Sequence, residues 1–367
     1  MRQRLRRIGV LTGGGDCAGL NAVIRAVAKS AILEYGMEVY GIADGFLGLI
    51  EDRMHELTAN DVSNILTQGG TILGTSNKAV PDRFVTGRDA NGDPIVEDVT
   101  PRVLEHIAAR GLEAVIVIGG DGSMSGAARL MQHGVRMIGV PKTIDNDLRH
   151  TDLTFGFQTA VEVATEALDR IHTTAASHHR VMLVETMGRN AGWLALHAGI
   201  ASGADVILIP EIPYHPEAVY RCCQARAEHR KNFTIIAVAE GARPVDGQVV
   251  VESIVPESPD PIRLGGVSTV LARQLSEATG LECRSTILGH VQRGGTPCAF
   301  DRVLATVFGQ HAVQLVVEGR WNQMVALQHG VICHVGIEKV AHHQRQVPRD
   351  APILRAARAV GTCMGDA

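Results

Sequence analysis

The sequence is poor in aromatic residues, in long apolar runs and in positive charge, and each shortage argues against a class of protein. Aromatic residues make up only 4% of the 367 residues, so base stacking on aromatic side chains, a common way to bind single-stranded nucleic acid, is not expected. No apolar run reaches the about 20 residues that a membrane-spanning helix needs. A formal net charge of −4 argues against a basic surface for nucleic acid or for an anionic membrane. We therefore expect neither nucleic acid nor membrane as a partner.

Closely spaced cysteine pairs of the Cys-x-x-Cys type are also missing. The seven cysteines are scattered and odd in number, which favours free thiols in a reducing compartment over a disulfide framework. The basic residues 1–7 precede an apolar run, residues 8–12, that is too short for the core of a signal peptide. These features predict a cytoplasmic protein.

Strand-like and helix-like runs alternate along most of the sequence, which is typical of parallel sheets covered by helices. At 367 residues the chain is long enough for two such units. We therefore predict an α/β fold with two similar lobes, each a mainly parallel sheet with helices on both faces. The strand candidates are residues 8–12, 114–118, 137–140, 180–185, 206–209, 234–239 and 284–288. The helix candidates are residues 21–34, 190–201 and 301–318 and a stretch that begins near residue 216.

Two segments interrupt this alternation and are expected to be excursions from the two sheets. Residues 82–101 are polar and contain glycines. Residues 243–266 are rich in proline and glycine around a short valine-rich centre, which predicts a hairpin-like insertion on the surface.

Two predicted strands end in residues suited to phosphate chemistry. Residues 119–123 (Gly-Gly-Asp-Gly-Ser) follow the first of them. The glycines would let backbone amides approach phosphate oxygens, and the Asp121 carboxylate is a candidate ligand for Mg²⁺. Residues 141–147 (Pro-Lys-Thr-Ile-Asp-Asn-Asp) follow the second and bring a lysine and two carboxylates together. These segments combine a phosphate cradle, a metal ligand, a base and a cation, as phosphoryl transfer requires. A helix-capping Asp-Asn-Asp cluster is the alternative for the second segment.

A third glycine-rich segment, residues 12–16 (Thr-Gly-Gly-Gly-Asp), lies between the first predicted strand and the following helix. Close backbone approach and the field of a helix N-terminus make it another candidate phosphate site. A tight strand–helix turn is the alternative. The dinucleotide fingerprint Gly-x-Gly-x-x-Gly is absent there, and the chain contains no Walker A loop.

In their order along the chain, these motifs resemble those of the 6-phosphofructokinase family. The family's phosphate loop matches residues 14–16, its catalytic loop residues 143–147, its Met-Gly-Arg residues 187–189 and its Gly-His-Val-Gln-Arg-Gly-Gly residues 289–295. The long segment 243–266 is similar to one in a longer form of the family. The resemblance implies a phosphoryl-donor-binding lobe with the catalytic loop in residues 1–147, a sugar-phosphate-binding lobe in residues 148–320, and a C-terminal segment, residues 321–367, that packs back on the first lobe.

The resemblance also implies a role for each matching residue. Asp145 would be the general base for the sugar hydroxyl, and the other catalytic residues would be Asp147, Arg189 and Thr143. The phosphoryl donor would bind to Gly14, Gly15, Lys78, Gly120, Asp121, Gly122, Ser123 and Lys142, with Asp121 as the metal ligand. The sugar phosphate would bind to Thr143, Asp145, Arg180, Met187, Gly188, Arg189, Glu240, Arg284, His290 and Arg293. Arg180 and Arg284 match positions that reach in from a neighbouring subunit, which implies a homodimer or homotetramer with shared active sites.

The family uses either ATP or inorganic pyrophosphate as its donor, and two positions bear on the choice. Pyrophosphate users are similar to one another in having an acid where this chain has Gly122 and a lysine where it has Lys142, whereas many bacterial ATP users have glycine at both. A carboxylate at position 122 would repel the α-phosphate of a nucleotide, so Gly122 favours ATP. Lys142 is compatible with either donor. Asn77 stands where many members have an arginine that touches the donor, and Lys78 is its expected substitute.

We therefore predict a Mg²⁺-dependent enzyme of glycolysis that transfers a phosphoryl group from ATP to the 1-hydroxyl of fructose 6-phosphate. The product would be fructose 1,6-bisphosphate. The reversible, pyrophosphate-dependent reaction is the first alternative. A regulator that binds sugar phosphates or nucleotides without catalysis is the second, and the intact Asp121, Asp145 and Asp147 argue against it.

Overall fold

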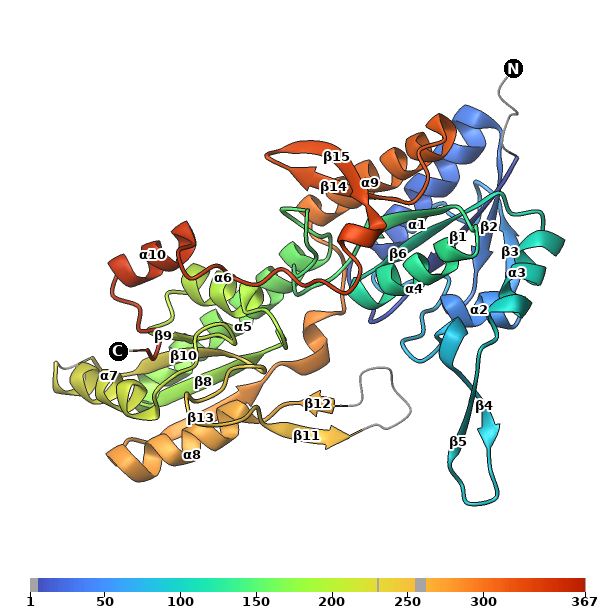
Figure 1. Ribbon diagram of the computed structural model, residues 1–367. Coiled ribbons are helices and arrows are strands. Elements are labelled where there is room, and N and C mark those ends of the chain that lie inside the picture. Colours follow the sequence, from blue (N-terminus) through green and yellow to red (C-terminus); the bar gives the residue numbers. More distant parts are fainter. Residues whose placement is uncertain (1–5, 230, 255–261, 367) are drawn as a thin grey trace.

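The computed structural model describes residues 6–229, 231–254 and 262–366, which form two α/β lobes (Figure 1). The described part of the first lobe is built on a seven-stranded sheet with the order β15-β14-β7-β6-β1-β2-β3. The central strands run parallel, whereas the edge strands β15 and β3 are antiparallel to their neighbours. The bounds are β1 Arg7–Thr12, β2 Glu38–Ile42, β3 Met54–Leu57, β6 Ala114–Gly119, β7 Met137–Pro141, β14 Gln323–Gln328 and β15 Val331–Gly336.

Helices cover both faces of this sheet because its central strands are apolar on both sides. In β6, Ile116 and Ile118 face one core, and Val115 and Val117 face the other, as the period of two along a strand requires. The helices of the first core are α1 Leu20–Lys29, followed by a π-helical turn Ser30–Glu34, and α9 Ala299–Glu318. The helices of the second core are α2 Phe46–Ile50, α3 Thr100–Ala109 and α4 Asp121–Gln132.

The position of α9 corrects the expected division of the chain. Its residues were assigned to the second lobe, but α9 packs along α1 of the first lobe. The two helices approach so closely that a Cβ on Gly309 would lie 2.7 Å from the Cβ of Ala26. The chain therefore returns to the first lobe at α9, before residue 320.

The second lobe has a four-stranded, fully parallel sheet in its described part, with the order β13-β8-β10-β9. Helices α5 and α6 pack on one face of this sheet, and α7 and α8 pack on the other. The predicted fold of two lobes with parallel sheets and helices on both faces is thus confirmed. The bounds are β8 Val181–Thr186, β9 Val206–Leu208, β10 Thr234–Ala239, β13 Cys283–Ile287, α5 Phe157–His178, α6 Trp193–Ala201, α7 Pro216–Glu228 and α8 Val267–Thr279.

Both excursions contain antiparallel hairpins. The first, β4 Phe84–Arg88 with β5 Pro94–Glu97, projects away from the first lobe (Figure 1). The second, β11 Val251–Ile254 with β12 Ile262–Leu264, belongs to the predicted surface insertion. The connection between β11 and β12, residues 255–261, lies outside the described residues.

The C-terminal segment only partly follows the expectation that it packs on the first lobe. Strands β14 and β15 extend the first sheet, and a short 3₁₀ turn, Ile337–Lys339, follows them. The chain then crosses to the second lobe, where α10 Pro352–Ala359 lies (Figure 1). There the backbone of Cys363 pairs with Val206 of β9 in an isolated parallel β-bridge. Within the described residues, no helix has the length and apolar character needed to cross a bilayer.

Candidate active site

A cavity of about 700 Å³ lies where the two lobes and the C-terminal crossing meet. The first lobe contributes the loop after β1, the N-terminus of α4 and the β4–β5 hairpin, and the second lobe contributes the loop after β8. Carboxyl ends of parallel strands are the usual place for ligands in such sheets. Among the lining residues are Gly14, Lys78, Asp121, Gly122, Ser123, Arg189, Asn190, His342 and Gln344.

The glycine loop after β1 is held in shape from within the protein. Gly14 has a φ of 77°, and its amide donates to the Ser76 carbonyl at 3.2 Å. The hydroxyl of Thr75 donates to the Gly14 carbonyl at 2.6 Å. Because both of its peptide groups are already used, Gly14 contributes an open backbone surface rather than a free amide donor.

The start of α4 also depends on glycines. A Cβ on Gly119 would lie 2.2 Å from the Ser123 hydroxyl, and one on Gly120 would lie 3.3 Å from the Lys142 carbonyl oxygen. A Cβ on Gly122, by contrast, would have no atom of the described residues within 4 Å. The helix N-terminus therefore faces the cavity across open space at Gly122, in an electrostatic field that favours anions.

Asp121 occupies the first turn of α4 and lines the cavity. Its Oδ1 accepts a hydrogen bond from the His342 amide at 2.8 Å and another from the Ser125 hydroxyl at 3.5 Å. Burial raises the pKa of Asp121, and the His342 amide opposes this shift. The described residues contain no cluster of three or more His, Cys, Asp or Glu side chains that could hold a metal ion. A single carboxylate fits Mg²⁺, which commonly binds through one or two carboxylates together with substrate phosphates.

Lys142 lies beneath the glycine loop rather than in open solvent. Its side chain is 4% exposed, and its ammonium group donates to the Gly15 carbonyl. Burial lowers the pKa of Lys142, and the nearby guanidinium of Arg293 acts in the same direction. Lys142 thus holds the glycine loop after β1 in place and adds positive charge beneath it.

The loop of residues 143–147 is fixed by local hydrogen bonds. Asn146 adopts a φ of 50°, which asparagine tolerates better than most residues, and its Oδ1 accepts from the Thr154 amide at 3.0 Å. The Thr154 hydroxyl donates to the Thr143 carbonyl at 2.7 Å, and the Asp145 amide donates to the Thr143 hydroxyl at 3.1 Å. These contacts hold Asp145 and Asp147 close to each other at the end of β7.

The carboxylates of this loop have strongly raised pKa values. Burial, with a further contribution from the charge of Glu240, raises the pKa of Asp145 to about 6, while Arg293 and Lys142 oppose the shift. Burial and the charge of Asp145 raise the pKa of Asp147 to about 7. The Oδ1 atom of Asp145 is buried and accepts no hydrogen bond from the described residues. An acceptor in this state is available to a hydroxyl group of a substrate.

The second lobe places its own predicted residues near this loop. Met187, Gly188 and Arg189 follow β8, and Glu240 follows β10, so all four lie at the carboxyl ends of neighbouring strands. Burial, with the charge of Glu185 second, raises the pKa of Glu240 to about 7. Gly188 has a φ of 129°, and a Cβ there would lie 2.9 Å from a carbonyl oxygen.

Arg293 bridges the two halves of the site. Its guanidinium lies directly over Gly15, so a Cβ on Gly15 would collide with it. The positive charge of Arg293 lowers the pKa of both Asp145 and Glu240. Its Nε is buried without a hydrogen-bond partner in the described residues. His290, which was predicted together with Arg293 to contact the sugar phosphate, is exposed on the 3₁₀ turn Gly289–Gln292.

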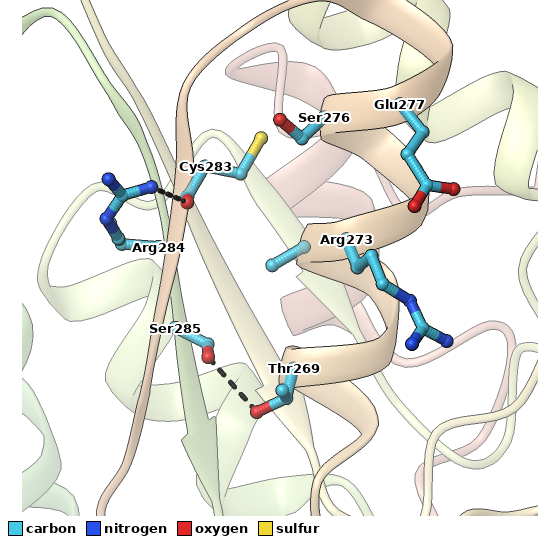
Figure 2. Close-up of a pocket in the computed structure, with 8 residues that line it drawn as sticks. Thr269, Arg273, Ser276, Glu277, Cys283, Arg284 and Ser285 are labelled. Carbon is cyan, nitrogen blue, oxygen red and sulfur yellow. Dashed lines mark hydrogen bonds between the residues drawn. The ribbon is translucent and has the colours of Figure 1, made fainter.

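Arg180 and Arg284 lie elsewhere. Arg180 directly precedes β8 and Arg284 is the second residue of β13, so both lie at the amino ends of these strands, where each forms an ion pair with Glu282, at 2.8 Å and 2.7 Å. The six residues of β8 span roughly 17–20 Å, so these arginines are at the far end of the sheet from Arg189. A second cavity, of about 500 Å³, opens beside Arg284 between α8 and β13 (Figure 2). Figure 2 shows Arg273 and Glu277 of α8 across this cavity, and Thr269 hydrogen-bonded to Ser285 of β13.

Comparison with known proteins identifies the group to which this site belongs. The family model described as phosphofructokinase matches residues 7–316. The chain belongs to the phosphofructokinase family. An ATP-dependent 6-phosphofructokinase 2 of Clostridium perfringens is 50% identical over 370 residues and covers 100% of both chains. A pyrophosphate–fructose 6-phosphate 1-phosphotransferase of Streptomyces coelicolor is 48% identical over 344 residues, which are 93% of this chain and 96% of the relative.

Solved phosphofructokinase structures share the architecture. The T-state phosphofructokinase of Pichia pastoris superposes with a TM-score of 0.77 and 33% identity, over 92% of this chain and 35% of that longer one. A structure titled pyrophosphate-dependent phosphofructokinase, from Nitrosospira multiformis, has a TM-score of 0.80 at 21% identity, over 98% of this chain and 93% of the other. Relatives with both donors thus share the fold and much of the sequence, so overall similarity does not decide the donor.

Sequence reasoning missed several residues that shape this phosphofructokinase-family site. Thr154 and Asn146 hold the loop of residues 143–147, and the buried side chain of Gln292 accepts from the Met187 amide at 3.3 Å. His342 and Arg345 approach from the C-terminal crossing. The Asp-Asn-Asp pattern was a usable signal for Asn146. Nothing local marks the others, because their contacts join segments that are distant in the sequence.

Proposed function

We propose that this enzyme transfers the γ-phosphoryl group of ATP to the 1-hydroxyl of fructose 6-phosphate, the reaction of glycolysis that yields fructose 1,6-bisphosphate and ADP, in the cytoplasm. The observation that carries the proposal is the buried, unpartnered Oδ1 of Asp145. The charges of Lys142, predicted for the donor, and of Arg293 and Glu240, predicted for the sugar, all act on the pKa of Asp145, so both groups of residues lie near it. The intact carboxylates Asp121, Asp145 and Asp147 disfavour a regulator without catalysis.

The proposed chemistry needs only a few groups of the protein. Asp145 accepts the proton of the 1-hydroxyl while that oxygen forms a bond to the γ-phosphorus and the bond from phosphorus to the β–γ bridging oxygen breaks. Arg189, which lines the cavity and whose Nη1 donates to the Ile262 carbonyl at 3.1 Å, would stabilise charge on the transferred group. Asp147, with a pKa near 7, and Thr143 orient the loop around the base. The sugar would bind to the loop after β8, to Glu240 and to the segment of His290 and Arg293.

Mg²⁺ is the cofactor that this arrangement suits. Asp121 would be its protein ligand, and the bound ion would neutralise phosphate charge on the donor. The hydrogen bonds of Asp121 to the described residues all involve Oδ1, so the His342 amide fixes the carboxylate by one of its two oxygens.

The shape of the cavity favours a nucleotide as the donor. The lining includes apolar residues of the β4–β5 hairpin, since Val85 and Val96 pair across it and are 36% and 49% exposed, while Arg83 and Arg129 line the cavity as well. Phe46, Ala79, Val80 and Pro94 complete this part of the wall. Pyrophosphate has no apolar group to place there, whereas a purine nucleoside does. The reversible pyrophosphate-dependent reaction remains the second candidate, because Lys142 and the Streptomyces coelicolor relative both support it.

A single assay tests the proposal. Purified protein would be supplied with fructose 6-phosphate and Mg²⁺ and with either ATP or pyrophosphate, and fructose 1,6-bisphosphate would be measured. We expect kcat/KM for ATP to exceed that for pyrophosphate. A preference for pyrophosphate would replace the donor, and no product with either donor would contradict the enzymatic function.

The activity should fall in acid with the titration of Asp145. A base with a pKa of about 6 is lost as the pH falls through that value, so the rate should drop about tenfold between pH 7 and pH 5. The measurement is the pH profile of kcat with saturating substrates. Fructose 6-phosphate carries a phosphate that titrates in the same range, so the residual activity of Asp145→Asn is the control, and it should lack this limb. A wild-type rate that stays constant down to pH 5 would contradict the assignment of the base.

Arg180 and Arg284 are too far from Asp145 of the same chain to share a substrate with it, so we propose that they complete the site of a neighbouring subunit. Arg180→Ala and Asp145→Asn should each abolish most activity. Mixing the two variants and letting subunits exchange should then restore about a quarter of wild-type activity in a dimer, since half of the molecules are hybrids and half of the sites in a hybrid are intact. The absence of recovery after verified exchange would show that each site is built from one chain.

A further inference from the structure

The segment of residues 342–347, which we call the strap, forms part of the wall of the candidate active site as the chain crosses between the lobes, since His342 and Gln344 line the cavity. It begins at the donor side, where the His342 amide donates to Oδ1 of Asp121 at 2.8 Å and also lies 3.2 Å from the Ser125 hydroxyl. It ends on the second lobe, where the Val347 amide donates to the Glu211 carboxylate at 2.8 Å. The strap therefore connects the proposed metal ligand to the opposite lobe.

The middle of the strap lies along the catalytic loop. Gln344 forms an antiparallel bridge with Leu148, and the Arg345 amide donates to the Asp147 carbonyl at 2.6 Å. The strap and the loop thus pair like two short strands. Any movement of the strap would be transmitted to Asp145 and Asp147 through these backbone bonds.

Arg345 is the residue that anchors the strap. Its Nη1 donates to the carbonyls of Thr151 and Asp152, at 2.7 Å and 2.6 Å. Its guanidinium lies over the ring of Trp193, 4.4 Å from the centroid, and the Trp193 indole donates back to the Arg345 carbonyl at 3.2 Å. A planar, charged group with several donors is suited to such a combination of stacking and carbonyl contacts, and lysine reproduces it only in part.

Trp193 extends this connection to the loop that carries Arg189. It is the first residue of α6, and Gly192 directly precedes it. The Gly192 amide donates to the Glu211 carboxylate at 3.0 Å, and the Val347 amide donates to the same carboxylate. The strap, the catalytic loop and the start of α6 are therefore linked by one set of contacts around Arg345.

We propose that Arg345 is a positioning residue for phosphoryl transfer, which locks the strap and thereby sets the placement of Asp121 relative to Asp145 and Asp147. This inference rests on the proposed function, because those carboxylates are the proposed metal ligand and base. Arg345 itself touches neither reacting group. Its effect is to keep Asp121 on α4 at a fixed position relative to the loop of Asp145 and Asp147 while the two substrates are bound between the lobes.

The test compares Arg345→Met with Arg349→Met. Arg349 belongs to the same crossing and donates to the Glu211 carbonyl at 3.4 Å, but it contacts neither α4 nor the catalytic loop among the described residues. Substitution of a residue that supports a metal ligand typically lowers metal affinity or activity by about 10–100-fold. For Arg345→Met we expect kcat to fall about tenfold or more, the KM for fructose 6-phosphate to stay within about threefold, and Mg²⁺–ATP to bind about tenfold more weakly by calorimetry without the sugar. Arg349→Met should stay within about twofold of wild type in all three.

Partial unfolding is separated from mispositioning by the binding measurement. If Arg345→Met merely reduced the folded fraction, kcat would fall in proportion to it and the Mg²⁺–ATP affinity of the remaining protein would be unchanged; that outcome overturns the proposal. If Arg345→Met does not fold, Arg345→Lys decides, since its single ammonium can still donate to the two carbonyls that Nη1 contacts, whereas the planar group stacked over Trp193 is lost. Intermediate values for Arg345→Lys support the proposal, and wild-type values overturn it. If the wild type is active and Arg345→Met has the same kcat and Mg²⁺–ATP affinity as Arg349→Met, this inference alone is refuted. If the wild type is inactive with both donors, the proposed function is refuted.

Discussion

Replacing Asp145 with asparagine should lower kcat by at least about 100-fold and change the KM for fructose 6-phosphate by no more than a few-fold, as expected for loss of a positioned general base. Asparagine keeps the size and the hydrogen-bonding capacity of the side chain but accepts no proton. It also removes a carboxylate that burial and the charge of Glu240 hold at a raised pKa. The variant should therefore fold at least as well as the wild type, because a buried charge next to other acids is lost.

Steady-state kinetics with saturating ATP and Mg²⁺ would measure this effect, with Asp93→Asn as a control for a generic acid-to-amide change. Asp93 is exposed in the turn of the β4–β5 hairpin, far along the chain from the catalytic loop. Asp93→Asn should behave like the wild type. Near-normal turnover of Asp145→Asn would show that another group takes the proton, and Asp147 would then be the first candidate.

Replacing Gly122 with aspartate should damage the use of ATP far more than the use of pyrophosphate. The new carboxylate would enter the open space at the N-terminus of α4 and approach the α-phosphate region of the donor. Two like charges about 4 Å apart in a partly buried site repel each other by up to about 4 kcal/mol, and half of that already corresponds to a loss of more than about tenfold. We expect kcat/KM for ATP to fall about 100-fold and any pyrophosphate activity to change only a few-fold.

The structure makes this variant a clean test of donor choice. No atom of the described residues lies within 4 Å of a Cβ at Gly122, and aspartate in the first turn of a helix is favourable, so folding should be preserved. Gly122→Asn is the matched control, because it adds the same bulk without the charge and should cost ATP activity much less. If Gly122→Asp leaves ATP use intact, or if the wild type prefers pyrophosphate, Gly122 does not select the nucleotide and the donor assignment is wrong.

The strands that carry the candidate motifs were predictable from short-range patterns, whereas β2, β3, β14 and β15 of the first sheet were not predicted. Each strand candidate is found with its ends within one residue of the predicted ones, because β-branched runs bounded by glycine, acidic or proline residues leave few alternatives. The 22-residue helix α5 was missed. Its apolar residues Phe157, Val161, Ala164 and Leu168 recur every three or four positions, as in an amphipathic helix, so the signal was present in the sequence and was overlooked. The helix packs this face against α6 and the second sheet.

The individual motifs were likewise readable before the structure, since glycine and acidic residues at strand ends have local reasons to be there. Gly119 and Gly120 are required by the close approach of Ser123 and Lys142. The sequence also placed these motifs directly after predicted strands, which is where parallel sheets usually bind ligands. It did not predict that Lys142 would be buried beneath Gly15, or that Gly14 would use its amide within the protein.

The sequence alone therefore determined which residues follow each predicted strand and what chemistry they allow, namely approach to a phosphate, binding of a cation or acceptance of a proton. Only the tertiary structure decided which of these ends form one site. It separated Arg180 and Arg284 from the other predicted residues, returned α9 to the first lobe, and brought His342 and Arg345 to the carboxylates. The physical reason is that local composition governs backbone conformation within a few residues. The raised pKa of Asp145 and the placement of Asp121 depend instead on burial and on contacts between segments about 200 residues apart, such as Asp147 with Arg345.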